Sequence, residues 1–380
     1  METNVIYCGD NLDVLPKYVH PESVDLIYID PPFNSNRIYE VFWGEAVEKR
    51  AFHDRFGDAM AYLDWMRGRI NELYKALKPN GTFFYHCDWH ASHYVKVELD
   101  RIFGANNFVN EIIWKRQTAH SDIGQGSKHM GRLHDSILFY AKGPAYTWHQ
   151  QYQVYDASYE ENFYKFVEPE TGRRYQLGDI TAPGGAAPSK GNPHYEFLGV
   201  TRYWRFSKKR MQELYEQGRI VQTKPGTVPR QKRYLDEMPG VPLQSIWLDI
   251  APIQAQSDER LGYPTQKPLA LLERIVSLTS NEGDIVLDAF CGCGTTLEAA
   301  AKLKRRWIGI DFSPTACRVM SERLERRLGL KEGRDFQLMD LPKTEEELRR
   351  MPHFEFQNWA CIALGGVPNK VKSADYGIDG

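Results

Sequence analysis

Short apolar runs alternate with amphipathic stretches in the first part of the chain. Residues 5–8, 24–29 and 82–85 are runs of apolar and aromatic side chains, which predict buried strands. Residues 62–77 carry apolar side chains three and four positions apart and lead into a Pro-Asn-Gly turn at residues 79–81, which predicts a helix and its end. The alternation predicts an α/β fold in which helices cover a mostly parallel sheet.

The same alternation returns in the last third of the chain. It predicts helices and strands in turn at residues 268–278, 285–287, 296–303, 307–310 and 314–328. Two further apolar runs, at residues 108–114 and 136–140, flank a polar, glycine-containing loop. We expect these two runs to form a terminal hairpin on the sheet.

The middle of the chain has no such regularity. From residue 143 to about residue 260 the sequence mixes aromatic, glycine, proline and basic residues, with a Pro-Gly-rich stretch at residues 181–193. We interpret this region as an inserted domain. The expected organisation is a discontinuous α/β domain, an insert and a carboxyl-terminal segment, at residues 1–141 with 256–330, 142–255 and 331–380 respectively.

Composition narrows the function classes. The formal net charge of −2 over 380 residues excludes a bulk polycation, so binding to nucleic acid would depend on local clusters of Lys and Arg. No apolar stretch approaches the roughly 18 residues that span a bilayer, and we expect a cytoplasmic protein that does not enter a membrane. The six cysteines lack Cys-x-x-Cys spacing, so we expect buried thiols and no metal site.

A glycine-containing turn between a predicted strand and a predicted helix is the strongest local signal. Residues 288–296 read Asp-Ala-Phe-Cys-Gly-Cys-Gly-Thr-Thr, and glycines let a backbone turn sharply and approach a ligand. Only Gly292 and Gly294 are present, which favours a cofactor without a diphosphate and disfavours a nicotinamide oxidoreductase. Asp311, about 20 residues further on, stands where a doubly wound fold places the acceptor for ribose hydroxyls. Alone, the turn could be a plain structural loop.

A second signal follows the strand at residues 24–29. Asp30, Pro31, Pro32 and Phe33 combine a carboxylate, rigid carbonyls and an aromatic ring. Carboxylate and carbonyl oxygens can both accept hydrogen bonds from one amino group, so the tetrapeptide suits a flat base with an exocyclic amine. Ligands of open α/β sheets bind at the carboxyl ends of strands, where both signals lie. An ordinary Pro-Pro turn is the alternative.

Taken in order, these motifs resemble those of the DNA amino-methyltransferases, in the subgroup whose catalytic motif precedes the target-recognition region and whose cofactor loop comes last. The matching segments are the tetrapeptide at residues 30–33, the Phe-x-Gly-x-Gly loop from Phe290, the segment 263–268 before it, the acidic turn 9–11 and the strand 134–139. The resemblance covers residues 4–141 and 260–328. It implies an S-adenosylmethionine-dependent, Rossmann-like sheet with a reversed terminal hairpin and an inserted target-recognition domain.

The resemblance also implies roles for individual residues. Catalysis would fall to Asp30, Pro31, Pro32 and Phe33, by direct methyl transfer to a flipped base without metal or covalent intermediate. Cofactor binding would fall to Asp10, Lys267, Asp288, Phe290, Gly292, Gly294, Thr295 and Asp311. An Asp at the first position of the tetrapeptide usually accompanies adenine N6 methylation in this family, and cytosine N4 remains the alternative.

Basic and aromatic residues interleave between residues 201 and 233, as a surface for phosphates and bases requires. We expect double-stranded DNA to contact Arg205, Lys208, Lys209, Arg210, Lys232 and Arg233. A solvated helix face is the alternative for residues 208–210. The loop at residues 117–132 is a further candidate, as a cover for the flipped base.

Other assignments stay open. The chain could be a protein or RNA amino-methyltransferase, or a modification subunit of a restriction system that is inactive alone, and it could form a homodimer. The segment at residues 354–380 is similar to the opening of restriction-endonuclease-like domains, with Asp379 as the metal-binding acid. This similarity predicts a chain that continues into a nuclease-like domain, whereas chance similarity of a frayed tail is the alternative.

Overall fold

The structure is a computed structural model. It describes residues 1–32, 38–41, 50–53, 59–117, 128, 130–182, 191–254, 256–261 and 265–341. The chain divides into two compact units, one of Met1–His149 with Gln244–Gly380 and the other of Gln150–Leu243. The second unit is shorter at both ends than the insert expected from the sequence. Phe33 and Asp379, and most of the loop at residues 117–132, lie outside the described residues.

Nine strands form the central sheet of the first unit. They are β1 (Val5–Cys8), β2 (Val24–Ile29), β5 (Leu77–Cys87), β6 (Phe108–Lys115), β7 (His134–Ala141), β16 (Ile246–Trp247), β17 (Ile285–Asp288), β18 (Arg306–Asp311) and β19 (Gln337–Met339). Their order is β16-β6-β7-β5-β2-β17-β18-β1-β19. Strand β7 runs antiparallel to both of its neighbours, and the other pairs are parallel. The expected α/β sheet with a reversed hairpin is confirmed.

Strand β16 extends this sheet beyond the hairpin. It pairs in parallel with β6, with Trp247 opposite Trp114. Trp247 is buried, and its indole nitrogen donates to the Gln244 carbonyl at 2.8 Å. A strand of two residues has no readable periodicity. The chain therefore rejoins the sheet within residues that the sequence assigned to the insert.

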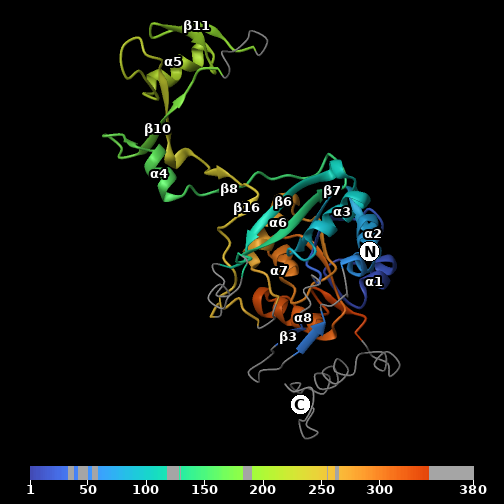
Figure 1. The fold of residues 1–380 in the computed structure, drawn as a ribbon. Coiled ribbons are helices and arrows are strands. Elements are labelled where there is room, and N and C mark those ends of the chain that lie inside the picture. The colour runs from blue at the N-terminus through green and yellow to red at the C-terminus, as the bar shows by residue number, and fades with distance from the viewer. Residues whose placement is uncertain are drawn as a thin grey trace. The chain divides into compact units, whose positions relative to one another are not determined.

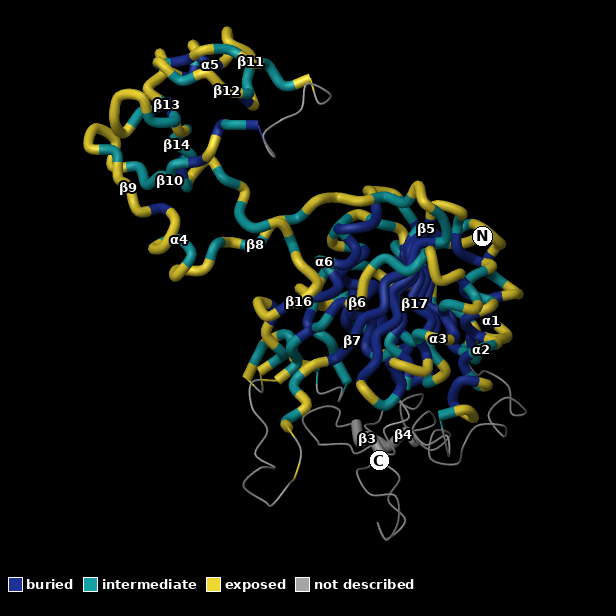
Figure 2. Tube along the Cα trace, turned by 45° about the horizontal axis from the view of Figure 1, so that its top comes forward, coloured by how far each residue is buried: buried dark blue, intermediate teal, exposed yellow. Residues whose placement is uncertain are grey.

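Among the described residues, six α-helices accompany the sheet (Figure 1). They are α1 (Asn11–Tyr18), α2 (Ala59–Ala76), α3 (Ser92–Phe103), α6 (Leu269–Thr279), α7 (Thr295–Lys302) and α8 (Pro314–Leu328). Contacts link α1 to α2 and α2 to α3, and likewise α6 to α7 and α7 to α8. Buried residues concentrate along the strands between these two groups (Figure 2).

Local sequence explains the bounds of α8, which match the prediction. The Ser313 hydroxyl accepts a hydrogen bond from the Ala316 amide at 3.3 Å, and Pro314 occupies the first turn. Gly329 ends the helix with φ 67°, a left-handed conformation that glycine adopts without strain. Helices α1 and α3 were not predicted. Helix α1 is short and contains Pro16, whereas α3 carries buried apolar residues at helical spacing, Val95, Leu99 and Phe103, which were a usable signal.

The described residues of the second unit form short strands and two α-helices around a small core. Its elements are β8 (Tyr152–Gln153), α4 (Ala157–Phe163), β9 (Phe166–Val167), β10 (Arg174–Asp179), β11 (His194–Phe197), β12 (Val200–Tyr203), α5 (Lys208–Glu216), β13 (Ile220–Val221), β14 (Arg230–Tyr234) and β15 (Val241–Pro242). One cluster of buried side chains includes Ile180, Trp204, Met211 and Leu214. The two ends of the unit run together, since β8 and β15 pair antiparallel.

Across the described part of the chain, none of the helices combines the length and the apolar character that crossing a membrane would require.

Candidate active site

Two sequence motifs that are far apart along the chain meet at one edge of the sheet. Asp30 directly follows β2, and the glycine turn directly follows β17. These two strands are parallel neighbours, with Leu287 opposite Ile27, so both motifs leave the sheet side by side. The Asn11 side-chain amide at the start of α1 donates to the Ala289 carbonyl at 2.9 Å and ties a third segment to this edge.

Asp30 has one paired oxygen and one unpaired oxygen. The Lys267 ammonium donates to Oδ2 of Asp30 and also to the Thr265 carbonyl at 3.4 Å. Oδ1 of Asp30 is buried and has no hydrogen-bond partner among the described residues. A buried carboxylate oxygen without a donor is unfavourable by about 1–3 kcal/mol or more. The geometry therefore suits a ligand that brings an N–H group to Oδ1.

Asp311 holds the glycine turn at the end of β18. Its Oδ2 accepts from the Gly292 amide at 2.8 Å, and its Oδ1 accepts from the Ser313 amide at 2.9 Å. Gly292 and Gly294 both have positive φ, 52° and 77°. A side chain at Gly294 would also come within 2.7 Å of the Met320 Cγ atom. Asp311 thus links the glycine turn to the residue that caps α8.

Asp288 and Thr295 lie beneath the turn rather than on its surface. Oδ1 of Asp288 accepts from the Phe290 amide at 2.9 Å, and Oδ2 accepts from the Thr296 hydroxyl at 2.6 Å. Burial raises the pKa of Asp288 to about 7, and the negative charges of Asp30 and Asp311 add to this effect. The Thr295 hydroxyl accepts from Arg323 at 2.9 Å. Both residues are thus engaged in holding the turn.

Asp10 caps the N-terminus of α1 and pairs with Arg69, which lies beside the rings of Trp65 and Phe290. Its Oδ1 accepts from the Leu12 amide at 2.9 Å, and its carboxylate forms an ion pair with Arg69 at 2.7 Å. The Arg69 guanidinium lies over the Trp65 ring at 4.1 Å, and that ring lies 6.0 Å from the Phe290 ring between centroids. Trp65 and Arg69 were not predicted from the sequence. The signal available was an arginine on the apolar face of the predicted helix.

A buried polar chain runs below the end of β2. The Tyr28 hydroxyl lies 2.7 Å from Nδ1 of His86, and Nε2 of His86 lies 3.2 Å from Oδ2 of Asp135. Arg116 pairs with the other oxygen of Asp135 at 3.2 Å. Burial acts to raise the pKa of Asp135, but the hydrogen bond with His86 and the charges of Lys267 and Arg116 bring it below its ordinary value.

The thiols at the turn are suited to packing rather than to nucleophilic attack. Cys291 and Cys293 are both buried. Burial raises the pKa of both thiols, and that of Cys291 lies well above its ordinary value. A thiol that stays protonated is a poor nucleophile.

The six basic residues predicted to contact DNA fall into different environments. Lys208, Lys209 and Arg210 form the exposed first turn of α5, where Arg210 also pairs with Glu213 at 3.0 Å. Arg205 is exposed as well, and its Nε donates to the Thr181 carbonyl at 2.8 Å. In contrast, Lys232 and Arg233 are part of β14.

These two side chains are partly buried within the small sheet. Lys232 pairs with Glu168 at 2.9 Å and lies 5.3 Å from the centroid of the Tyr175 ring. Arg233 donates to the Asp179 carbonyl at 3.5 Å across the β10–β14 pair. Sequence position alone does not distinguish such residues from the exposed cations of α5.

Comparison with known proteins gives one consistent family. The sequence model of a DNA methylase family matches residues 24–322. The type II methyltransferase M.EcaI of Enterobacter cloacae is 29% identical, over 85% of this chain and 69% of that protein. The StyLTI Mod subunit, a type III restriction-modification protein of Salmonella typhimurium, is 28% identical over 79% of this chain, which spans only 50% of its length. The DNA adenine methyltransferase YhdJ of Escherichia coli is 26% identical over 85% and 83%.

Proposed function

Because the chain belongs to the DNA methylase family, we propose that it transfers a methyl group from S-adenosylmethionine to N6 of adenine in double-stranded DNA. The observation that carries this proposal is the unpartnered, buried Oδ1 of Asp30 beside the glycine turn. When bound, S-adenosylmethionine supplies a methyl group on a positively charged sulfur. The edge of the sheet offers acceptors for this cofactor in the carboxylates of Asp311 and Asp10, and a flat apolar wall in Phe290 and Trp65.

Asp30 would orient the amine for transfer. Its Oδ1 accepts one N–H of the target amino group, and the Pro31 carbonyl accepts the other, which draws the nitrogen lone pair out of conjugation with the base. Lys267 holds Oδ2 and balances the charge, so Oδ1 remains the acceptor that faces the substrate. A fixed pair of acceptors favours the reactive geometry over other orientations of the amine. In this proposal Asp30 and Pro31 position the nucleophile, and no enzyme side chain forms a bond to it.

Adenine is favoured over cytosine on two grounds. The family resemblance associates Asp at the first position of the tetrapeptide with adenine N6, and the relative YhdJ is a DNA adenine methyltransferase. Cytosine N4 methylation uses the same two hydrogen bonds and is the alternative product. The Mod subunit among the relatives supports a second candidate function, that of a modification subunit that needs a partner for activity.

We assign target recognition to the second unit. Its exposed cations on the first turn of α5 suit contacts with phosphates, which bind without regard to base identity. Arg205 is the other exposed candidate. Lys232 and Arg233 support the sheet on which these residues depend.

Sequencing with modified-base detection tests the whole proposal. The chain is expressed in a host that lacks DNA methylation, and the host DNA should then carry N6-methyladenine within one sequence context. The matched control is the Asp30→Ala variant expressed at the same level, which should leave the DNA unmodified. N4-methylcytosine in place of N6-methyladenine would replace the target assignment. Unmodified DNA from the unchanged chain, together with no labelling in vitro, would refute independent activity.

A further inference from the structure

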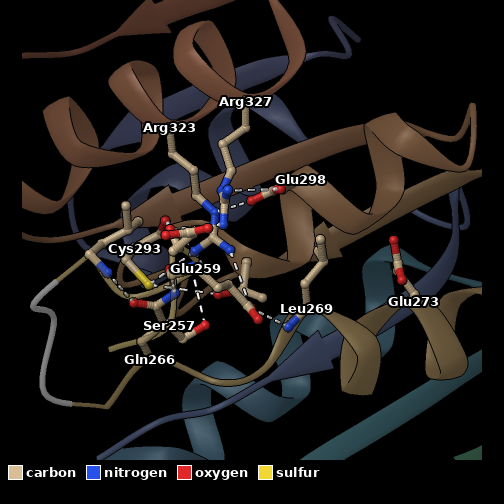
Figure 3. Close-up of polar contacts among 12 residues, drawn as sticks. Ser257, Glu259, Gln266, Leu269, Glu273, Cys293, Glu298, Arg323 and Arg327 are labelled. Carbon is tan, nitrogen blue, oxygen red and sulfur yellow. Dashed lines mark hydrogen bonds and ion pairs between the residues drawn. The ribbon is translucent and has the colours of Figure 1, made fainter. Parts of the chain in front are cut away.

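Arg323 on α8 is a buried cation directly behind the glycine turn. Its side chain is 0% exposed and forms an ion pair with Glu298. Its Nη1 donates to the Cys293 carbonyl at 3.3 Å and to the Thr295 hydroxyl at 2.9 Å. Figure 3 shows the guanidinium reaching the turn from α8. One guanidinium thus holds both residues that flank Gly294.

The other side of the same guanidinium faces the segment that carries Lys267. Nη2 of Arg323 lies 4.0 Å from Oε1 of Glu259, and this oxygen accepts the Leu269 amide at 2.5 Å at the start of α6. The Gln266 side chain also binds Glu259, because its Nε2 donates a hydrogen bond to the Glu259 carbonyl at 2.6 Å. Lys267 lies between Gln266 and Leu269, which both form hydrogen bonds with Glu259. Its ammonium donates a hydrogen bond to Asp30.

Stability alone is a weak explanation for this arrangement. A buried ion pair gains little over a well-packed apolar side chain, because removing the charges from water is costly. The guanidinium, however, has a planar set of donors that can fix several acceptors at once, which an apolar side chain cannot do. Here Nη1 donates to acceptors on the glycine turn, and Nη2, which has no hydrogen-bond partner among the described residues, faces the Glu259 carboxylate of the other segment at 4.0 Å.

We propose that Arg323 is a positioning residue that fixes the glycine turn and the Lys267 segment relative to each other, and so aligns the bound methyl donor with Asp30. This inference rests on the proposed function. It assigns to Arg323 no contact with either ligand. Its effect would come from geometry, since a shift of about 1 Å in a positioned group can reduce a rate by about 10²-fold.

The first test is Arg323→Lys, which keeps the positive charge and loses the planar donors. The dissociation constant for S-adenosylmethionine, measured by calorimetry without DNA, should rise about tenfold because the turn loses its support at Cys293 and Thr295. The matched control is Arg326→Lys on the same helix. The Arg326 side chain is 77% exposed and lies 3.5 Å from the Glu322 carboxylate. The control should bind the cofactor as the unchanged chain does.

The second test is Glu259→Gln, which keeps an acceptor for the Leu269 amide and removes the charge that faces Arg323. This change weakens the contact between Arg323 and the segment that carries Lys267. We expect kcat to fall by about tenfold, with the dissociation constant for the cofactor and the KM for DNA nearly unchanged. Arg323→Lys should lower kcat as well, and its loss and that of Glu259→Gln should be less than additive in the double variant, because both changes break the contact between Arg323 and Glu259.

A purely structural role predicts a different result. In that case Arg323→Lys lowers the melting temperature, while the folded protein keeps its normal cofactor affinity and kcat, and this outcome would overturn the proposal. If Arg323→Lys does not fold, Glu259→Gln decides, and an unchanged kcat in that variant overturns the proposal as well. An unchanged chain that methylates no DNA would refute the proposed function, whereas the calorimetric comparison of Arg323→Lys with Arg326→Lys would still test the support of the turn.

Discussion

The two units differ in how deeply their polar and charged side chains are buried. In the first unit, Arg323 and Glu298, and likewise His86 and Asp135, are buried in contact with each other. Among the described residues, every polar or charged side chain classed as buried belongs to this unit. In the second unit Arg173 pairs with Asp236 at 2.7 Å, but both side chains remain partly or largely exposed.

This difference indicates two ways of using charge. A buried polar group is held in one place by its partners, and removing a partner leaves the other unsatisfied at a large energetic cost. An exposed charge is screened by salt and contributes little to stability. The buried pairs of the first unit can therefore hold groups in place, and the contacts with DNA that we propose for the exposed cations of α5 in the second unit should weaken as salt increases.

The largest expected effect comes from the unpaired oxygen at the end of β2. Asp30→Ala should reduce kcat by about 10³-fold, because the target amine loses the acceptor that orients it. Cofactor affinity should change little, since the cofactor contacts proposed above lie on the glycine turn, β18, the start of α1 and α2. Radioactive methyl transfer and calorimetry measure the two quantities. Asp64→Ala, at an exposed carboxylate on α2, is the control, and near-normal turnover of the Asp30 variant would contradict the assignment.

The next largest effect is expected at the end of β18. Asp311→Ala removes an acceptor for cofactor hydroxyls and the support of the Gly292 amide. The loss should be about 1–3 kcal/mol, which corresponds to an affinity about 5- to 150-fold weaker. Calorimetric titration with S-adenosylmethionine checks this value. An unchanged dissociation constant would show that Asp311 plays no part in cofactor binding.

The exposed turn of α5 provides a test of the second unit. Replacing Lys208, Lys209 and Arg210 together by Ala should weaken DNA binding and lower the slope of log affinity against log salt by up to about 3, nearly one for each lost phosphate contact. Lys232→Met is the comparison, because Lys232 already pairs with Glu168 and should change the slope less. Fluorescence anisotropy over a salt series measures both. A slope that stays constant in the triple variant would make this turn an ordinary solvated helix face.

The last prediction concerns the pH dependence of stability rather than activity, at the buried carboxyl of Asp288 in the first unit. The folded protein raises the pKa of Asp288 from 3.8 to about 7, so the native state keeps a proton that the unfolded state has released between these values. This group alone therefore makes stability fall as pH rises through that window, by at most about 1.4 kcal/mol per pH unit. Asp288→Asn should remove this contribution. Urea unfolding at several pH values within the window compares the two proteins, and identical pH profiles would exclude it.

The sequence predicted those features that depend on neighbouring residues. Strands β1 and β2 and helix α8 have the predicted bounds, because a run of apolar residues or a capped amphipathic helix is a local pattern. The meeting of Asp30 with the glycine turn also followed from the sequence, since the carboxyl ends of parallel strands share one edge. A pattern of two residues, such as β16, carries too little periodicity to predict.

Only the tertiary structure decided which side chains are partners. Lys267 and Asp30 are 237 positions apart, and no local pattern indicates that they pair. Arg323 lies on a helix that the sequence predicted well, yet its burial and its contacts depend on α7 and on the segment before α6. Likewise, the sequence does not distinguish Lys232 from the exposed cations of α5, whereas the pairing of β14 with β10 places Lys232 in an ion pair with Glu168. The physical reason is that periodicity records which face of an element is buried, whereas the partner of a buried charge depends on how separate elements pack.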